Sequence, residues 1–248
     1  MTVEARRHIA AIIFDVDGVL LASPHERAWR EALTGFGDPA RFTTALYQVE
    51  VAGKPRLDGA RATLKALGVV DGDARAEAYA QAKQTRLEAL IDAGAVKAFP
   101  DALRFVADVS KFGWPLAVAS SSKNAEAMLR RIQLPSGRSL HDAFVGDVCG
   151  HDVPHGKPAS DLFLLAARTL AIPPERCLVI EDAPAGIAAA RAGAMAGAMA
   201  ALGVARLQDA ESLNTAGADL VVTGLDAVSR PALARGTLRL ASSTDEDL

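Results

Sequence analysis

The sequence predicts an α/β protein: a doubly wound, Rossmann-like parallel sheet with a small α-helical domain inserted after the first strand. From residue 101 onward, apolar runs suited to strands alternate with helical segments, the pattern of a parallel sheet with right-handed crossovers. Residues 24–91 differ, because they contain almost no β-branched runs and have helical periodicity. We therefore expect a discontinuous core domain, residues 1–21 and 96–248, and a helical domain, residues 22–95.

The first predicted strand begins near Ile9 and ends directly before Asp15. Its continuous apolar, β-branched run is typical of a strand buried on both faces, and Gly18 then lets the backbone turn. Because residues two apart on an extended chain point the same way, Asp15 and Asp17 face one small volume. Such carboxylates repel each other unless a divalent cation binds or one pKa rises. The alternative is a surface turn or a calcium loop, but the apolar residues after Gly18 supply no further calcium ligands.

The remaining elements follow from periodicity. Three helices are expected in the inserted domain, over residues 26–33, 60–67 and 74–91. In the core domain we expect, in order, helix 102–111, strand 116–120, helix 124–132, strand 143–148, helix 160–170, strand 177–180, helix 185–192 and strand 219–222. One more strand is needed to complete the sheet, and we place it in the alanine-rich repeat at 193–200, although alanine has a weak strand propensity.

Polar side chains follow the other predicted strands as well. Ser120 ends the second strand, Lys157 follows the third, and Glu181 and Asp182 end the fourth. Ligands of parallel sheets bind at the carboxyl ends of the strands, so these groups and Asp15 converge on one crevice. Taken singly, each has a simpler interpretation: a helix cap at the serines, a solvated loop lysine, and an acidic turn. Their occurrence together favours a functional site.

Phosphoryl transfer is the chemistry that these groups indicate. A carboxylate that attacks a phosphate dianion meets a repulsion of ~4 kcal/mol per charge pair at about 4 Å and an effective dielectric of about 20. Asp15 with Asp182, supported by Glu181, can hold a Mg²⁺ that offsets this repulsion. Asp17 is the candidate general acid and base. Two further groups would contact the remaining phosphoryl oxygens: Lys157 and the hydroxyl of Ser120.

Four segments, in this order, resemble the four motifs of the haloacid dehalogenase (HAD) superfamily: Phe-Asp-Val-Asp-Gly-Val at 14–19, the serine-ended strand, Gly-Lys-Pro at 156–158, and Ile-Glu-Asp-Ala-Pro-Ala-Gly-Ile at 180–187. The resemblance covers nearly the whole chain. It implies that Asp15 is the nucleophile of an aspartyl-phosphate and that Mg²⁺ is bound by Asp15, the carbonyl of Asp17 and Asp182. The helical insert then resembles the small cap of this superfamily. A dehalogenase proper is disfavoured, because those members lack the second acid, Asp17.

Within the superfamily, the chain is similar to the β-phosphoglucomutase-like subfamily. The Ser-x-Ser-Lys-Asn run at 120–124 and the His-x-x-Ala-Trp segment at 25–29 carry this similarity. It implies substrate-binding roles for six residues: His25, which helps to position the acid and base, Arg56 and Lys83 in the insert, and Ser122, Lys123 and Asn124 around a second phosphate. A helix is expected to begin at this run, and its free amides attract anions. A mutase needs such groups, because its bisphosphate intermediate must be held away from water.

Each of the insert residues has an alternative interpretation. Lys83 would then be a solvent-facing helix lysine, Arg56 would cap a helix or pair with Asp58, and His25 would be a structural residue near a hinge. A zinc site at Cys149, His151 and His155 is a further alternative, but no fourth ligand is evident.

We therefore expect a Mg²⁺-dependent phosphotransferase that acts on a small sugar phosphate, with a phosphatase of the same fold as the alternative. The formal net charge of −3 and the pI near 6.0 give no basic footprint for nucleic acid. The uncharged run 192–205 is too short to span a membrane, and the two cysteines form no disulfide framework. A cytoplasmic protein is expected, and a monomer is sufficient, because one chain supplies every proposed group.

Overall fold

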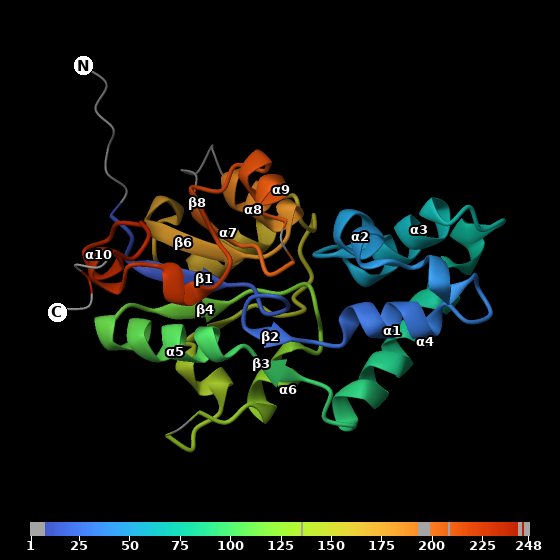
Figure 1. Ribbon diagram of the computed structural model, residues 1–248, viewed down its shortest axis with the longest axis horizontal. Helices are drawn as coiled ribbons and strands as arrows, with labels where there is room; N and C mark the ends of the chain where they lie inside the picture. Colours follow the sequence, from blue (N-terminus) through green and yellow to red (C-terminus); the bar gives the residue numbers. More distant parts are fainter. Residues whose placement is uncertain (1–7, 135, 193–198, 208, 243–244, 246–248) are drawn as a thin grey trace. The chain divides into compact units, whose positions relative to one another are not determined.

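The computed structural model describes residues 8–134, 136–192, 199–207, 209–242 and 245. The chain forms two compact units (Figure 1). The first, called the core unit below, comprises Met1–Leu21 and Ala98–Leu248, and the second, the helical unit, comprises Ala22–Lys97.

The core unit is built on a six-stranded sheet in the order β5-β4-β1-β6-β7-β8, in which neighbouring strands run parallel. This sheet confirms the predicted α/β fold class. The strands are β1 (Ala11–Phe14), β4 (Leu116–Val118), β5 (Gly146–Asp147), β6 (Cys177–Glu181), β7 (Ala200–Val204) and β8 (Leu220–Val222). The helices of this unit are α5 (Pro100–Val109), α6 (Ala125–Arg131), α7 (Asp161–Thr169), α8 (Pro184–Ala192), α9 (Ala210–Thr215) and α10 (Arg230–Ala234).

Strand β1 lies between β4 and β6, and both of its faces are covered. Ile13 belongs to a cluster with Phe163 of α7 and Ile187 of α8. The next side chain, Phe14, points the other way and makes an edge contact with Phe105 of α5, with 6.1 Å between ring centroids. Helices α7 and α8 accordingly lie on one side of the sheet and α5 on the other (Figure 1). Burial on both faces explains why β1 is a continuous apolar run.

The helical unit contains α1 (His25–Ala32), the short α2 (Thr44–Leu46), α3 (Arg56–Ala66) and the long α4 (Gly72–Asp92). Its core is a separate cluster that includes Trp29, Leu64 and Tyr79. The Tyr79 hydroxyl donates a hydrogen bond to the Trp29 carbonyl over 2.8 Å, which satisfies the one polar atom of this large buried side chain. The two-residue strands β2 (Leu21–Ala22) and β3 (Lys97–Ala98) pair where the chain leaves and re-enters the core unit.

Four details differ from the sequence-based expectation. The strand placed at 193–200 is found as β7, Ala200–Val204, and residues 193–198 lie outside the described residues. Leucine and valine, rather than the alanine repeat, supply the side chains that suit this strand. The strand expected at 143–148 is shorter, and helices α2, α9 and α10 and strands β2 and β3 were not predicted. None of the described helices is long and apolar enough to cross a membrane.

We expect Ile13→Ala to lower the free energy of unfolding by about 2–5 kcal/mol, because it leaves a cavity in a closely packed site. Ile13 is fully buried. The measurement is urea-induced unfolding. Val145→Ala is the matched control, since Val145 is 77% exposed and its truncation should change stability by no more than about 0.5 kcal/mol. Equal losses in the two variants would contradict the assigned packing of β1.

Candidate active site

A buried ammonium group joins two carboxylates at the carboxyl ends of β1 and β6. Lys157 Nζ donates to Asp15 Oδ1 over 2.6 Å and to Glu181 Oε1 over 2.5 Å. Asp15, Lys157 and Glu181 are 6%, 4% and 1% exposed. The strand register brings the two acids together. Phe14 of β1 pairs with Ile180 of β6, so the residues that follow them, Asp15 and Glu181, lie at the same edge of the sheet. Three groups far apart in sequence therefore form one buried ionic cluster.

Two glycines make room for the acidic side chains. A Cβ at Gly186, in the first turn of α8, would lie 1.8 Å from Glu181 Oε1. A Cβ at Gly18 would lie 1.9 Å from Asp182 Oδ2, and Gly18 also has a φ of +80° that favours glycine. The other Glu181 oxygen, Oε2, accepts hydrogen bonds from the backbone N–H groups of Asp182 and Ala183, both 3.0 Å. Both oxygens of Glu181 are thus engaged by donors of the chain.

Asp15 and Asp182 hold their protons more tightly than free carboxyl groups do, because the pKa of each is raised. Burial raises the pKa of Asp15 to about 7, with Glu181 and Asp17 adding to the rise and Lys157 opposing it. Burial and the neighbouring carboxylates also raise the pKa of Asp182. For Lys157, burial acts to lower the pKa, but the charges of Asp15 and Glu181 outweigh it, so the pKa lies above its ordinary value. One ammonium therefore faces a surplus of acidic groups.

The acidic group fits a magnesium ion. Carboxylate oxygens of Asp15, Glu181 and Asp182 lie within 4.8 Å of one another. Mg²⁺ prefers such hard oxygen ligands, and a divalent cation would offset the surplus negative charge beside Lys157. The residues predicted to hold the metal are in this way gathered at one place, except that Asp17 contributes no side chain to the group.

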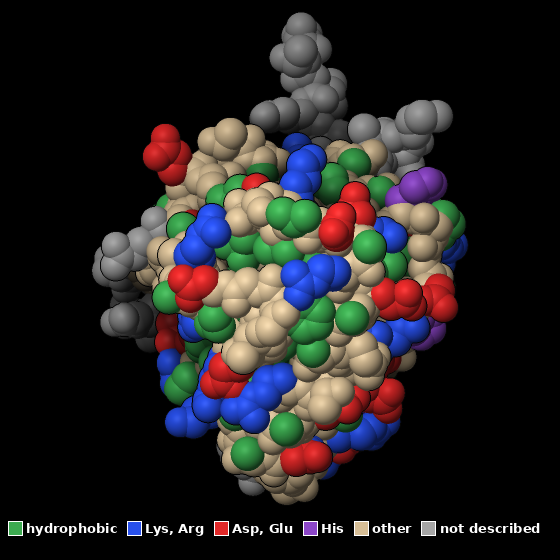
Figure 2. Space-filling view, turned by 90° about the vertical axis from the view of Figure 1, so that its right-hand side faces the viewer, with side chains coloured by type: hydrophobic (Ala, Val, Ile, Leu, Met, Phe, Trp, Pro, Cys, Tyr) green, Lys and Arg blue, Asp and Glu red, His purple; other side chains and the backbone are tan. Residues whose placement is uncertain are grey.

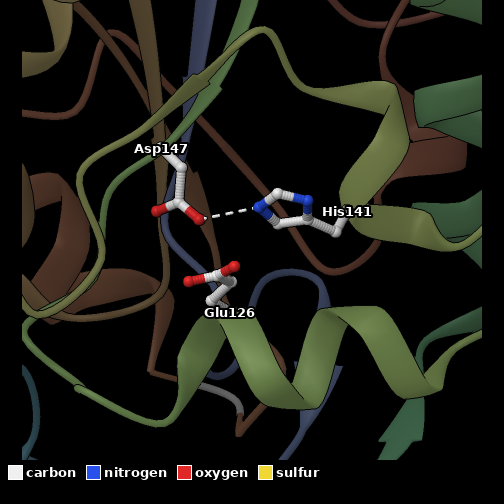
Figure 3. Close-up of side chains that lie close together, drawn as sticks. All are labelled: Glu126, His141 and Asp147. Carbon is white, nitrogen blue, oxygen red and sulfur yellow. Dashed lines mark hydrogen bonds and ion pairs between the residues drawn. The ribbon is translucent and has the colours of Figure 1, made fainter.

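A second group of metal-spaced side chains occurs among the described residues, at Glu126, His141 and Asp147 (Figure 3). Here the side chains already have partners within the chain. His141 Nε2 and Asp147 Oδ2 are 2.8 Å apart, and Asp147 Oδ1 accepts from the Cys149 N–H over 2.7 Å. Glu126 pairs with Arg130 over 2.9 Å. His141, in the turn Leu140–Ala143, is thus joined to the end of β5, and Glu126 is paired within α6.

The zinc alternative at Cys149, His151 and His155 finds no support. Neither metal-spaced group among the described residues includes any of the three. Burial and the nearby Asp147 raise the pKa of the Cys149 thiol, which disfavours the thiolate that zinc requires. His155 lies 3.5 Å from Asp161 instead.

The serine-rich loop follows β4, the neighbour of β1, and is tied together by its own hydroxyl groups. The backbone N–H of Ser122 donates to Ser120 Oγ over 3.1 Å, and that of Asn124 donates to Ser122 Oγ over 3.3 Å. Ser120 is buried, at the same sheet edge as Asp15. The side chain of Lys123, by contrast, is 67% exposed and lies 3.5 Å from Asp152. The structure thus brings Ser120 near the acidic cluster and leaves the Lys123 side chain at the surface.

Two of the predicted binding residues of the helical unit contact each other. Lys83 Nζ lies 2.9 Å from His25 Nδ1 and 5.1 Å from the centroid of the Trp29 ring. Lys83 is only 3% exposed, so the interpretation as a solvent-facing lysine is wrong. Because an ammonium group only donates, Nδ1 of His25 is the acceptor, and the hydrogen of the neutral ring is on Nε2.

Arg56 begins α3 and donates to Gln84 Oε1 over 2.5 Å. The alternative, an ion pair between Arg56 and Asp58, is not formed between these two described residues. Asp58 instead lies 3.6 Å from Arg61, and Arg56 contacts Gln84. Arg56 is exposed. Figure 2 shows Lys and Arg side chains interspersed with Asp and Glu side chains on the face it displays.

Sequence reasoning missed one contact to the loop that follows β1. Arg206 donates to the carbonyls of Gly18 and Val19, directly after Asp17. Residues 206 and 18 are 188 positions apart, and no motif surrounds the arginine. Arg206 follows β7 by two residues, but it lies six residues beyond the strand predicted at 193–200, so no signal in the sequence indicated this contact.

Comparisons with known proteins agree with this geometry. The haloacid dehalogenase-like hydrolase family matches residues 9–193. A β-phosphoglucomutase of Mycobacterium bovis is 32% identical over 238 residues, covering 88% of this chain and 90% of the relative. A fructose-1-phosphate phosphatase of Escherichia coli is 35% identical over 194 residues, covering 75% of this chain and 93% of the relative. The solved β-phosphoglucomutase of Pyrococcus sp. strain ST 04 has a TM-score of 0.64 at 29% identity, covering 86% and 92% of the two chains.

We expect Mg²⁺ to stabilise the protein more at about pH 8 than at about pH 5.5. The pKa of folded Asp15, about 7, exceeds the ordinary value of 3.8. The folded state therefore binds this proton more tightly, and the stability it contributes falls as the pH rises from 3.8 to about 7. Above that range the ionised carboxylates bind the cation, which adds about 2.7 kcal/mol at a hundred times its Kd. Thermal unfolding with and without Mg²⁺ measures the difference.

Two variants sharpen this measurement. Asp182→Asn removes a proposed ligand and should abolish the Mg²⁺-dependent rise in Tm. Asp147→Asn, in the second acidic group, should keep it. A full rise in Asp182→Asn, or its loss in Asp147→Asn, would place the ion elsewhere.

Proposed function

We propose a specific activity from one premise: the chain belongs to the haloacid dehalogenase-like hydrolase family. This membership confirms the resemblance predicted from the sequence, including its β-phosphoglucomutase-like character, and makes the protein an enzyme of the phosphatase and phosphomutase type. The proposed activity is phosphoryl transfer on a small sugar phosphate through an aspartyl-phosphate at Asp15, with a β-phosphoglucomutase-like outcome. The alternative is a phosphatase that releases inorganic phosphate from a small phosphate ester.

The observation that carries the proposal is the contact of buried Lys157 with Asp15. A carboxylate is a weak nucleophile toward a phosphate dianion, because both are negative. Lys157 donates a hydrogen bond to Asp15 and reduces this repulsion. It also opposes the rise in the Asp15 pKa that burial causes, and so favours the ionised acid. Asp15 then forms a bond to phosphorus while the bond to the leaving oxygen breaks, and Asp17 gives that oxygen its proton. In the second step Asp17 takes a proton from the attacking hydroxyl group, and the phosphoryl group leaves Asp15.

The proposed metal ligands are Asp15, the carbonyl of Asp17, and Asp182. Glu181 is proposed to support these ligands by holding Lys157 and the chain around Asp182. One of its oxygens accepts from Lys157, and the other accepts from two backbone N–H groups. When bound, Mg²⁺ supplies positive charge that offsets the charge of the phosphoryl oxygens. Ser120 is proposed to contact one of those oxygens. Enzymes of this family generally use Mg²⁺, and the acidic group fits it.

For the second phosphate of a mutase substrate, we propose His25, Arg56 and Lys83 of the helical unit, acting as a cap, with Ser122, Lys123 and Asn124 of the core unit. The buried Lys83, held by His25, supports this assignment, because a buried cation is costly unless it serves a purpose. The mutase relative supports it as well. The phosphatase alternative is supported by the relative named for fructose 1-phosphate.

Phosphorus NMR separates the two activities. With Mg²⁺, β-glucose 1-phosphate and a trace of the 1,6-bisphosphate, we expect glucose 6-phosphate with little inorganic phosphate. Asp15→Asn is the control and should lose turnover while remaining folded, because the amide keeps the shape of the side chain but is not a nucleophile. Inorganic phosphate as the main product would identify a phosphatase. Turnover retained by Asp15→Asn would refute Asp15 as the nucleophile.

The distal-phosphate assignment predicts a selective defect. Arg56→Ala or Lys83→Ala should reduce mutase turnover by at least about tenfold, since each loses a charge-assisted contact worth roughly 1.5–3 kcal/mol. Phosphorylation of Asp15 by a small donor such as acetyl phosphate should be little changed. Arg61→Ala, an exposed arginine on the same helix as Arg56, is the control. If both substitutions leave mutase turnover unchanged, these residues do not bind the distal phosphate.

A further inference from the structure

The guanidinium group of Arg206 joins two segments of the core unit. Nε donates to the Gly18 carbonyl over 2.8 Å, and Nη2 donates to the Val19 carbonyl over 3.0 Å. Nη1 donates to Asp101 Oδ2 over 3.1 Å. The side chains of Arg206 and Asp101 are 14% and 13% exposed, so this contact is largely shielded from water. Such a charge-assisted, forked contact is stronger than an exposed ion pair.

We propose that Arg206 is a positioning residue for Asp17, the general acid and base of the proposed phosphoryl transfer. The inference rests on the proposed function, because it concerns the acid of that reaction. Arg206 has no assigned role in the motifs that identify the family. It acts on Asp17 through the backbone, since the carbonyls it binds belong to the two residues that follow Asp17.

The loop that carries Asp17 is short and closed by its own backbone. The Val16 carbonyl accepts from the N–H groups of Leu20 and Leu21 over 3.0 and 2.9 Å, and the Gly18 N–H donates to the Leu21 carbonyl over 2.9 Å. The carbonyls of Gly18 and Val19 point to Arg206 instead. Gly18 has a positive φ, and glycine adopts positive and negative φ values about equally readily, so the residue alone does not fix the backbone here. An external anchor on the peptide after Gly18 therefore restricts the orientation of the Asp17 backbone.

Arg206 is itself held by two further groups, Asp101 and Phe99. Asp101, in the first turn of α5, also accepts from the Leu225 N–H over 2.7 Å through the same Oδ2. The Arg206 guanidinium carbon lies 3.7 Å from the centroid of the Phe99 ring. The Phe99 N–H donates to the Leu20 carbonyl over 3.0 Å, which links the ring back to the loop. Loop, arginine and helix start therefore form a closed set of contacts, and movement of one requires movement of the others.

Only arginine suits this position. Its planar fork presents N–H groups in three directions at once, whereas lysine offers a single charged nitrogen. Lysine can keep the ion pair with Asp101 but cannot reach both carbonyls in the same geometry. Arg206→Lys should therefore preserve most of the fold and lose part of the positioning.

The test uses two aryl esters that differ in their need for an acid. Nitrophenolate is a stable leaving group, so p-nitrophenyl phosphate reacts with little help from a proton, while phenyl phosphate needs one. General acids accelerate such steps by about 10²–10⁴-fold. In Arg206→Met we expect kcat/KM with Mg²⁺ to fall at least about tenfold more for phenyl phosphate than for p-nitrophenyl phosphate. Asp17→Asn should show the same selectivity, and Arg206→Met should add little to it in the double variant.

Two further variants complete the design. Arg206→Lys should give the same selectivity to a smaller degree, and it serves if Arg206→Met does not fold. Arg104→Met is the matched control, because Arg104 forms an exposed forked pair with Asp226, with side chains 58% and 53% exposed, and should keep wild-type rates on both esters.

Each result decides a different claim. Equal losses on both esters in the Arg206 variants, or no loss at all, would overturn the positioning role while leaving the proposed function intact. A wild-type protein that transfers phosphate neither from these esters nor from β-glucose 1-phosphate would overturn the proposed function, and the inference with it.

Discussion

The buried ammonium of Lys157 is the interaction on which the rest of the site depends. It lies between Asp15 and Glu181, and all three side chains are almost inaccessible to water. Two like charges about 4 Å apart repel by about 4 kcal/mol at an effective dielectric of about 20, so the acids need a counter-charge to lie together. Removing one partner of such a buried group typically costs about 3–5 kcal/mol. Lys157 thus permits the acids to lie together in the fold and, in the proposed reaction, favours the ionised form of Asp15.

The sheet brings this charge arrangement about. Because β1 lies between β4 and β6, the residues that follow these strands meet at one edge, which is the rule for ligand sites in parallel sheets. Two glycines, Gly18 and Gly186, then let the loop after β1 and the helix α8 approach the acids more closely than a Cβ would permit. Arg206 donates hydrogen bonds to two carbonyls of the same loop. The strand order therefore determines where the acidic site lies, and the close approach of the backbone at the two glycines determines its shape.

What could be predicted from the sequence follows from local pattern. Strand ends could be recognised at three places: the apolar run before Asp15, the serines after residue 119, and the acids at 181–182. A parallel sheet then implies that the side chains at these ends lie close together. Most of the strand predicted at 193–200 lies outside the described residues, and β7 is found at Ala200–Val204, where leucine and valine suit a strand. The burial of Lys83 and the contacts of Arg206 could not be predicted. Their partners lie 58 and 188 residues away, and neither helical period nor motif spacing carries such information.

The central claim is that Asp15 carries the phosphoryl group during the reaction. It is tested most directly by quenching the protein in acid during turnover with Mg²⁺ and acetyl phosphate, and by mapping the modified peptide by mass spectrometry. The account predicts the added mass of one phosphoryl group on Asp15, with none on Asp17. A phosphoryl group on any other residue, or continued turnover with an unmodified Asp15 peptide at every time point, would contradict it.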